Sequence, residues 1–187
     1  YYIMDNKQDN QSKRKYFFVN PFEKQKEKNP MKPSYIKPDG TEVIELQEDF
    51  GLRVLEKNPD GTLIMRCYDK KNKLWLDYAR QGNIEIGHHY DEFGNMDYKY
   101  DSVYDEHNVL AMKTEYDMEY HDNGVLKAEI ITTLTGNITT YCQYDETGKR
   151  TEKIEERGAV KTYFDENDKP FKREIDRGSG GIITEEL

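Results

Sequence analysis

The stretch Tyr90-Asp91-Glu92-Phe93-Gly94 sets the pattern that decides the fold of this chain. We call the pattern the turn phrase: an aromatic residue, usually an aspartate next, two further residues, and then glycine or asparagine. Aspartate favours the first position of a type I turn, and glycine or asparagine tolerates the left-handed backbone needed at the fourth. The turn phrase therefore predicts a hairpin with a three-residue loop. Further copies begin at Tyr68, Tyr104, Tyr120 and Tyr144, and a degenerate copy begins at Phe164.

Side chains between these turns alternate in polarity over residues 74–164. Even-numbered positions are largely apolar, and the odd positions between them are largely charged. A three-residue loop keeps the parity of side chains across a turn, so we expect one apolar face along the whole sheet. Alternation of this kind is typical of antiparallel strands with one solvated face. The predicted pairs are Tyr120–Leu126, Tyr104–Leu110, Met118–Ala128, Tyr116–Ile130 and Tyr98–Tyr116.

The prediction is a single all-β domain over residues 35–187. It is expected to be an antiparallel up-and-down meander of about nine to eleven strands joined by three-residue hairpin loops. We expect this sheet to be strongly twisted or closed into a barrel-like form, because monomers rarely expose a large apolar face. A second sheet, an identical subunit or a foreign ligand are the other ways to cover that face. Residues 1–34 predict a poorly ordered arm with a candidate strand at 16–19.

Charge is distributed unevenly along the chain. Residues 1–34 hold eight Lys or Arg against four acidic residues, which leaves 20 basic and 33 acidic residues for the remainder. An acidic body argues against nucleic acid as a partner, because phosphates require a basic surface. No stretch approaches the roughly 18 to 20 apolar residues that a membrane helix needs, so no transmembrane segment is expected.

The first residue of the sequence bears on where in the cell the protein is located. The chain begins at Tyr1 without a methionine, which favours an extracytoplasmic protein that is secreted, periplasmic or surface-anchored. If Tyr1 is instead the boundary of a fragment, the protein is cytoplasmic.

Cys67 and Cys142 are too few and too distant for a zinc site. The sequence leaves open whether they pair, since pairing depends on their separation in space.

Two kinds of bacterial hairpin repeat are similar to parts of this chain. The stretches Tyr90-Asp-Glu-Phe-Gly-Asn95 and Tyr144-Asp-Glu-Thr-Gly-Lys149 resemble the YD repeats of cell-surface and toxin-encapsulating shell proteins. Residues 119–129 resemble the MORN-like variant repeat of bacterial antitoxin-type and lipoprotein-type proteins. The resemblance spans about residues 68–169. It implies a scaffold or binding surface, and it brings no catalytic residues with it.

Residues able to do chemistry form no recognised pattern. His88 and His89 are neighbours on a strand, so they point to opposite faces and cannot share a metal. His107 and His121 fall in successive turns, which lie at opposite ends of a meander. We therefore expect no metal, no cofactor and no catalytic residue, and the chain is not expected to be an enzyme.

The apolar face is then the candidate site. We predict a non-enzymatic binding or scaffold module of an exported protein, which binds a protein partner or a second copy of itself. One alternative is an antitoxin or immunity-type protein that occupies a toxin's surface. Another is a small-molecule carrier with an aromatic-lined cavity that also holds Ser102, Thr114, Thr132 and Thr140. The candidate binding residues are Tyr98, Tyr100, Tyr116, Tyr120 and His88.

Overall fold

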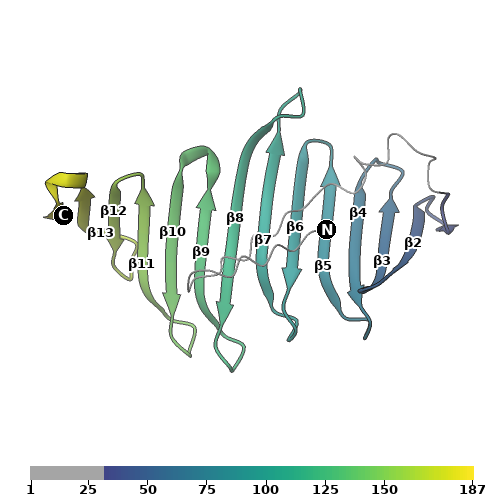
Figure 1. Cartoon of the computed structure of the whole chain (residues 1–187), viewed down its shortest axis with the longest axis horizontal. Helices are drawn as coiled ribbons and strands as arrows, with labels where there is room; N and C mark the ends of the chain where they lie inside the picture. Colours follow the sequence, from purple (N-terminus) through teal and green to yellow (C-terminus); the bar gives the residue numbers. More distant parts are fainter. Residues whose placement is uncertain (1–31) are drawn as a thin grey trace. The chain divides into compact units, whose positions relative to one another are not determined.

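The computed structural model describes residues 32–187, so most of the predicted arm, with its candidate strand at 16–19, lies outside the described residues. The described chain forms one antiparallel sheet of 14 strands, in which each strand pairs with the next in sequence (Figure 1). The strands are β1 (Tyr35–Ile36), β2 (Glu42–Glu48), β3 (Gly51–Lys57), β4 (Leu63–Asp69), β5 (Leu74–Gln81), β6 (Ile84–Tyr90), β7 (Met96–Tyr104), β8 (Leu110–Tyr120), β9 (Leu126–Thr133), β10 (Ile138–Tyr144), β11 (Arg150–Arg157), β12 (Val160–Phe164), β13 (Pro170–Asp176) and β14 (Ile182–Glu186). Short 3₁₀ turns, η2 (Leu134–Gly136) and η3 (Gly178–Gly180), precede β10 and β14.

This architecture confirms the predicted all-β, up-and-down antiparallel meander. The described sheet has more strands than expected, and it is open, because β1 and β14 are its two edges and do not pair with each other. The described residues therefore enclose no barrel interior of the kind proposed for a carrier.

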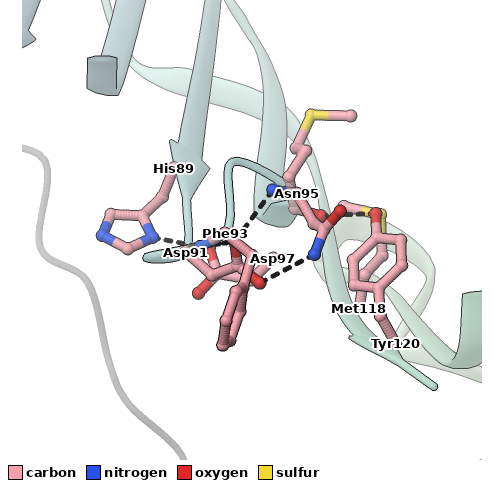
Figure 2. Close-up of polar contacts among 8 residues, drawn as sticks. His89, Asp91, Phe93, Asn95, Asp97, Met118 and Tyr120 are labelled. Atoms are coloured by element: carbon pink, nitrogen blue, oxygen red, sulfur yellow. Dashed lines mark hydrogen bonds and ion pairs between the residues drawn. The ribbon is translucent and has the colours of Figure 1, made fainter. Parts of the chain in front are cut away.

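The turn phrase forms the turn that its residues predict. In the copy at Tyr90, the Gly94 N–H donates to the Asp91 carbonyl at 3.1 Å. The Asp91 carboxylate also accepts hydrogen bonds from the backbone N–H groups of Phe93 and Asn95, both at 2.8 Å (Figure 2). The fourth position has a positive φ in every copy, which explains why glycine, asparagine or aspartate stands there. These residues are Asn72, Gly94, Asn108, Gly124, Gly148 and Asp168.

A one-residue register shift follows every turn phrase. Beyond the pair Tyr90–Met96, His89 pairs with Tyr98, so Asp97 is an extra residue on β7. This is the arrangement of a β-bulge, in which two residues of one strand lie opposite one residue of the other. The extra residues in the copies are Trp75, Asp97, Ala111, Lys127, Thr151 and Phe171.

The bulge reverses the parity that the loop itself preserves. The predicted pairs next to the turns, Tyr120–Leu126 and Tyr104–Leu110, are confirmed. The predicted pairs beyond the bulge are wrong, because every partner is displaced by one residue. Tyr98 pairs with Asp117, Tyr116 with Ile131, Met118 with Glu129, and Ala128 with Glu119. Apolar residues are consequently distributed over both faces of the sheet.

Most of the buried residues lie on one face between β3 and β7, whereas Val43 of β2, which pairs with Glu56, is buried on the other face. We call the face that carries Tyr78 and Tyr100 face A, and the opposite one face B. Cross-strand partners on face A form the row Leu55, Met65, Tyr78, Gly87 and Tyr100. Tyr78 and Tyr100 are each 2% exposed. Among the residues described after Ser102, only Cys142 is buried, so the core lies in the first half of the sheet.

Long basic side chains lie over aromatic rings of adjacent strands. On face A, Lys113 Nζ is 5.0 Å from the centroid of the Tyr100 ring, and on face B, Lys99 Nζ is 5.0 Å from that of Tyr116. Such contacts contribute about 0.5–1 kcal/mol at exposed sites, and the alkyl stem shields the ring from water. The bulges place basic side chains opposite or next to aromatic ones on the neighbouring strand. Side chains of the sheet itself therefore cover part of its apolar surface. Further contacts between adjacent strands are Lys153–Phe164 and Lys172–Tyr163, and Arg80 of β5 lies over the ring of Tyr104 on β7.

Candidate functional site

The predicted binding residues do not lie on one surface. Tyr98 and Tyr100 are on face A, where Tyr100 pairs with Gly87. His88 and Tyr116 are on face B, because Lys99 pairs with both of them. The single apolar face that would have gathered these residues is therefore absent from the described sheet. Their role in binding stays a prediction.

Tyr120 connects two hairpins. Its hydroxyl donates a hydrogen bond to the Met96 carbonyl at 2.8 Å, and it lies 3.9 Å from the sulfur of Met118 (Figure 2). Burial raises the pKa of this phenol above its ordinary value. The hydroxyl therefore stays protonated and donates to the neighbouring hairpin, which is a structural use of this residue.

A buried carboxylate joins two central tyrosines of face A. Glu85 is 6% exposed, and it accepts hydrogen bonds from the hydroxyls of Tyr78 at 3.0 Å and Tyr100 at 2.9 Å. Arg80 Nη1 lies 3.9 Å from the same carboxylate. Burial, followed by the charge of Glu85, raises the pKa of both phenols, so both remain donors at neutral pH. The cluster satisfies a buried charge and orders the centre of the sheet.

Gly87 makes this cluster possible. A Cβ atom at this position would lie 2.2 Å from Cε1 of the Tyr100 ring. The ring thus occupies the space that a side chain would take, and this position lets the phenol reach Glu85. Covering a strand glycine with an aromatic ring from the adjacent strand is a known way to stabilise a sheet.

The histidines are distributed over different parts of the sheet. His88 Nδ1 lies 3.7 Å from Asp77 Oδ2, and His89 Nδ1 lies 2.5 Å from Asp97 Oδ1 (Figure 2). Asp97 is the extra residue of its bulge, so the bulge places this carboxylate beside the histidine. His107 and His121 occupy the turns before and after β8, at opposite ends of the sheet, as predicted.

Metal and thiol chemistry have few candidate residues in the described chain. No group of three or more His, Cys, Asp or Glu side chains within residues 32–187 is arranged to hold a metal ion. Cys67 and Cys142 are both buried, and no disulfide joins them. Burial also raises the pKa of the Cys142 thiol, which keeps it protonated and unreactive.

The turns at one end of the sheet are connected to one another. His121 replaces the aspartate of the turn phrase in its copy, and its Nε2 lies 3.0 Å from the Tyr144 carbonyl in the next hairpin. In the same turn, Asn123 Nδ2 donates to the Glu146 carbonyl at 3.1 Å. Sequence reasoning missed this connection, although a histidine at a position otherwise held by aspartate was a visible signal.

Exposed apolar side chains gather at the opposite end of the sheet. Ile84 and Met112 lie on face B on either side of Val103, with which both pair. Leu134 belongs to η2, and η2 lies beside β8, since Thr135 Oγ1 donates to the Ala111 carbonyl at 3.1 Å. Figure 1 shows that the β7–β8 hairpin extends beyond its neighbours at this end. We call Ile84 (49% exposed), Val109 (59%), Leu110 (43%), Met112 (45%) and Leu134 (50%) the tip patch.

The tip patch coincides with an overhanging part of β8. Pairing of β8 with β7 begins at Leu110, whereas pairing with β9 begins only at Thr114. Residues 110–113 therefore have a neighbouring strand on one side only. The other side of this overhang is partly covered by η2, whose Thr135 hydroxyl donates to the Ala111 carbonyl, while the apolar side chains around it stay exposed. Exposed apolar side chains gathered in this way favour contact with another protein chain.

In the part of the chain that the structure describes, no helix has the length and apolar character needed to cross a membrane.

Comparisons with known proteins leave the family open. The resemblance to YD and MORN-like repeats stays a prediction from the sequence. No protein-family model matches this chain, and a search of curated proteins finds no match either.

Proposed function

We propose that this protein is a non-enzymatic binding module, in which the sheet is the scaffold and the tip patch contacts a protein partner. The observation that carries the proposal is the exposure of these large apolar side chains at one end of the sheet, each above two-fifths. In contrast, the rings of Tyr100 and Tyr116 lie under lysine side chains of adjacent strands. Apolar clusters on a monomer commonly mark interaction sites.

The surroundings of the tip patch support an interface. The turn between β7 and β8 carries Asp105, Glu106 and His107, all exposed, next to the apolar residues. Arg80 Nη2 donates to Asn108 Oδ1 at 2.5 Å, which connects the turn to β5. An apolar centre with a polar rim is the usual composition of a protein interface. The acidic rim favours a partner whose apolar contact residues are flanked by basic ones.

A crosslinking experiment tests the proposal. A photoreactive amino acid is placed at Met112 in the tip patch and, as a matched control, at Glu152, an exposed residue of β11. We expect one discrete adduct from position 112 and none from position 152 in cells that produce the protein. The captured partner is then purified, and its affinity is measured for the wild type and for Leu110→Asp and Met112→Asp.

The aspartate variants should bind this partner at least about tenfold more weakly, the scale of one interface hot spot. Equal adducts from both positions, or unchanged affinity of the variants, would show that the tip patch is not the binding surface. The predicted location outside the cytoplasm is a separate prediction, which cell fractionation checks.

A further inference from the structure

The last strand presents an edge that another strand can extend. β14 pairs with β13, and no described strand pairs with its other side. The register with β13 runs from Lys172–Glu186 to Asp176–Ile182 without a shift. β14 contains no proline, no lysine and no bulge, three features that protect many edge strands from pairing, and its charged residues are Glu185 and Glu186.

The edge formed by β1 is different. β1 has two residues, Tyr35 and Ile36, and it lies between Pro33 and Pro38. A short strand offers few backbone groups, and proline cannot donate a hydrogen bond. The described sheet thus has one protected edge and one that is ready to pair.

The occupied side of β14 shows which residues suit it. Lys172 and Arg173 of β13 lie opposite Glu186 and Glu185, and Arg173 Nη1 is 3.8 Å from Glu185 Oε2. At the other half of the strand, Ile175 of β13 lies opposite Ile183. An antiparallel neighbour of β14 therefore meets acidic residues at one half and isoleucines at the other. Matched cross-strand pairs contribute roughly 0.2–1 kcal/mol each.

We propose that the open edge of β14 binds an extended peptide segment by strand addition. The segment runs antiparallel to β14 and carries basic residues opposite Glu185 and Glu186 and an apolar residue opposite Ile183, as β13 does. Side chains of a strand keep their two faces toward both neighbours, so the added strand meets the same chemistry as β13 does. Backbone hydrogen bonds supply affinity, and the alternating side chains supply sequence preference. This surface is separate from the tip patch, so the proposal goes beyond the proposed function and does not depend on it.

A second copy of this chain fits the edge less well. Two antiparallel β14 strands related by a twofold axis at Thr184 would place Glu185 opposite Ile183 and Glu186 opposite Ile182. The carboxylates would then gain no cationic partner across the new pair, and the isoleucines would gain no apolar one. Self-association is therefore the competing outcome of the test.

Backbone direction identifies the residue to change. The Leu187 N–H donates to the Phe171 carbonyl of the β13 side at 2.9 Å. Backbone N–H and C=O groups alternate in direction along a strand. The backbone groups of Glu185 therefore also point toward β13, whereas those of Thr184 and Glu186 point toward the open edge. Thr184→Pro removes one outward donor and leaves the ladder with β13 in place, since proline is tolerated on that side of an edge strand. Thr184→Ala keeps the donor and is the matched control.

The probe is a fluorescent, end-blocked peptide with the sequence of residues 170–176, because β13 is a strand that β14 accepts. Its affinity for the full chain is measured by fluorescence anisotropy. A second peptide with Lys172→Glu and Arg173→Glu tests the charge preference. We expect the first peptide to bind the wild type and Thr184→Ala equally, and to bind Thr184→Pro at least about tenfold more weakly. The charge-reversed peptide should bind the wild type at least about tenfold more weakly as well.

Several results would overturn the proposal. Equal binding of the two peptides would remove the charge preference, and equal binding to Thr184→Pro would place the peptide elsewhere. Sedimentation without peptide that shows a dimer in the wild type and a monomer in Thr184→Pro would assign the edge to a second copy. If circular dichroism shows that Thr184→Pro is unfolded, hydrogen exchange on the wild-type protein tests the proposal instead. Added peptide should slow exchange at the amides of Thr184 and Glu186, and unchanged exchange there contradicts strand addition.

Discussion

Replacing Gly87 with alanine tests the cluster at the centre of face A. The added Cβ would lie 2.2 Å from Cε1 and 2.8 Å from Cζ of the Tyr100 ring. Because Tyr100 is 2% exposed, its ring has no open space to move into without displacing other core atoms. A shift of the ring also stretches the 2.9 Å hydrogen bond from its hydroxyl to Glu85. Overpacking and a weakened bond to a buried carboxylate therefore act together.

The magnitude follows from these two effects. Overpacking in a dense core costs about 1–3 kcal/mol. Loss of a hydrogen bond that leaves a buried group unsatisfied costs about 1–3 kcal/mol more. Alanine also makes the unfolded chain less flexible, which offsets about 0.4–1 kcal/mol of this cost. This offset applies because Gly87 has a backbone conformation that any residue can adopt. We expect Gly87→Ala to lower the free energy of unfolding by about 1–5 kcal/mol.

The assay is urea unfolding followed by circular dichroism. Gly136→Ala is the matched control, because its Cβ would meet only the flexible end of Ile138 at 3.0 Å, and we expect little change in stability. In a Tyr100→Ala background the cost of Gly87→Ala should fall sharply, since the ring is no longer there. The reasoning would be refuted if Gly87→Ala were as stable as the wild type. It would also be refuted if the substitution lowered the free energy of unfolding equally in both backgrounds.

Three further changes test other parts of the structure. Gly94→Ala should lower the free energy of unfolding by about 1–2 kcal/mol and Gly94→Asn by less, because Gly94 has a φ of 92°; equal costs in urea unfolding would contradict the turn assignment. His121→Ala should cost about 0.5–1.5 kcal/mol through loss of its contact with the Tyr144 carbonyl, whereas exposed His107→Ala should stay within about 0.5 kcal/mol of the wild type. Hydrogen bonds from the Thr147 side chain and the Lys149 backbone hold the pKa of Asp145 below its ordinary 3.8, so its contribution to stability is present above that pH and is lost as the pH falls through the folded value. Asp145→Asn should therefore differ from the wild type near neutral pH and converge with it in acid, and carboxyl NMR that finds an ordinary pKa for Asp145 would contradict this.

The turns could be predicted from sequence because their geometry restricts the residue. Only a few residue types tolerate the positive φ at Asn72 or Gly94, so the letters at these positions carry structural information. The degenerate copy obeys the same rule, with Asp168 at a φ of 61°. Strand order followed from the turns, since short hairpins place consecutive strands side by side.

The bulges could not be predicted in the same way. The extra residues include Trp75, Asp97, Ala111 and Lys127, which share no chemical property that a sequence pattern could select. An unseen extra residue moves every later side chain to the opposite face, so the predicted grouping of Tyr98 with Tyr116 failed although the turn beside it was right.

The tip patch escaped sequence reasoning for a different reason. Leu110 and Met112 continue the alternation of β8, which assigns them to a covered face. Whether they are covered depends on how far the neighbouring strand extends, and β9 ends at Thr133, opposite Thr114. Strand length relative to a neighbour is a property of two segments together, and periodicity within one segment does not contain it.

The bulges also determine how a sheet of this design can change in width. A bulged turn at one end of a hairpin and a two-residue turn at the other, as at Gly82-Asn83, each reverse the parity of the side chains. Two reversals cancel, so inserting or deleting a complete hairpin leaves every remaining strand with its original faces. A single added strand would exchange the faces of all the strands after it. Such a sheet can therefore grow or shrink in steps of two strands, roughly 10 Å at a time, without redesign of the residues that remain.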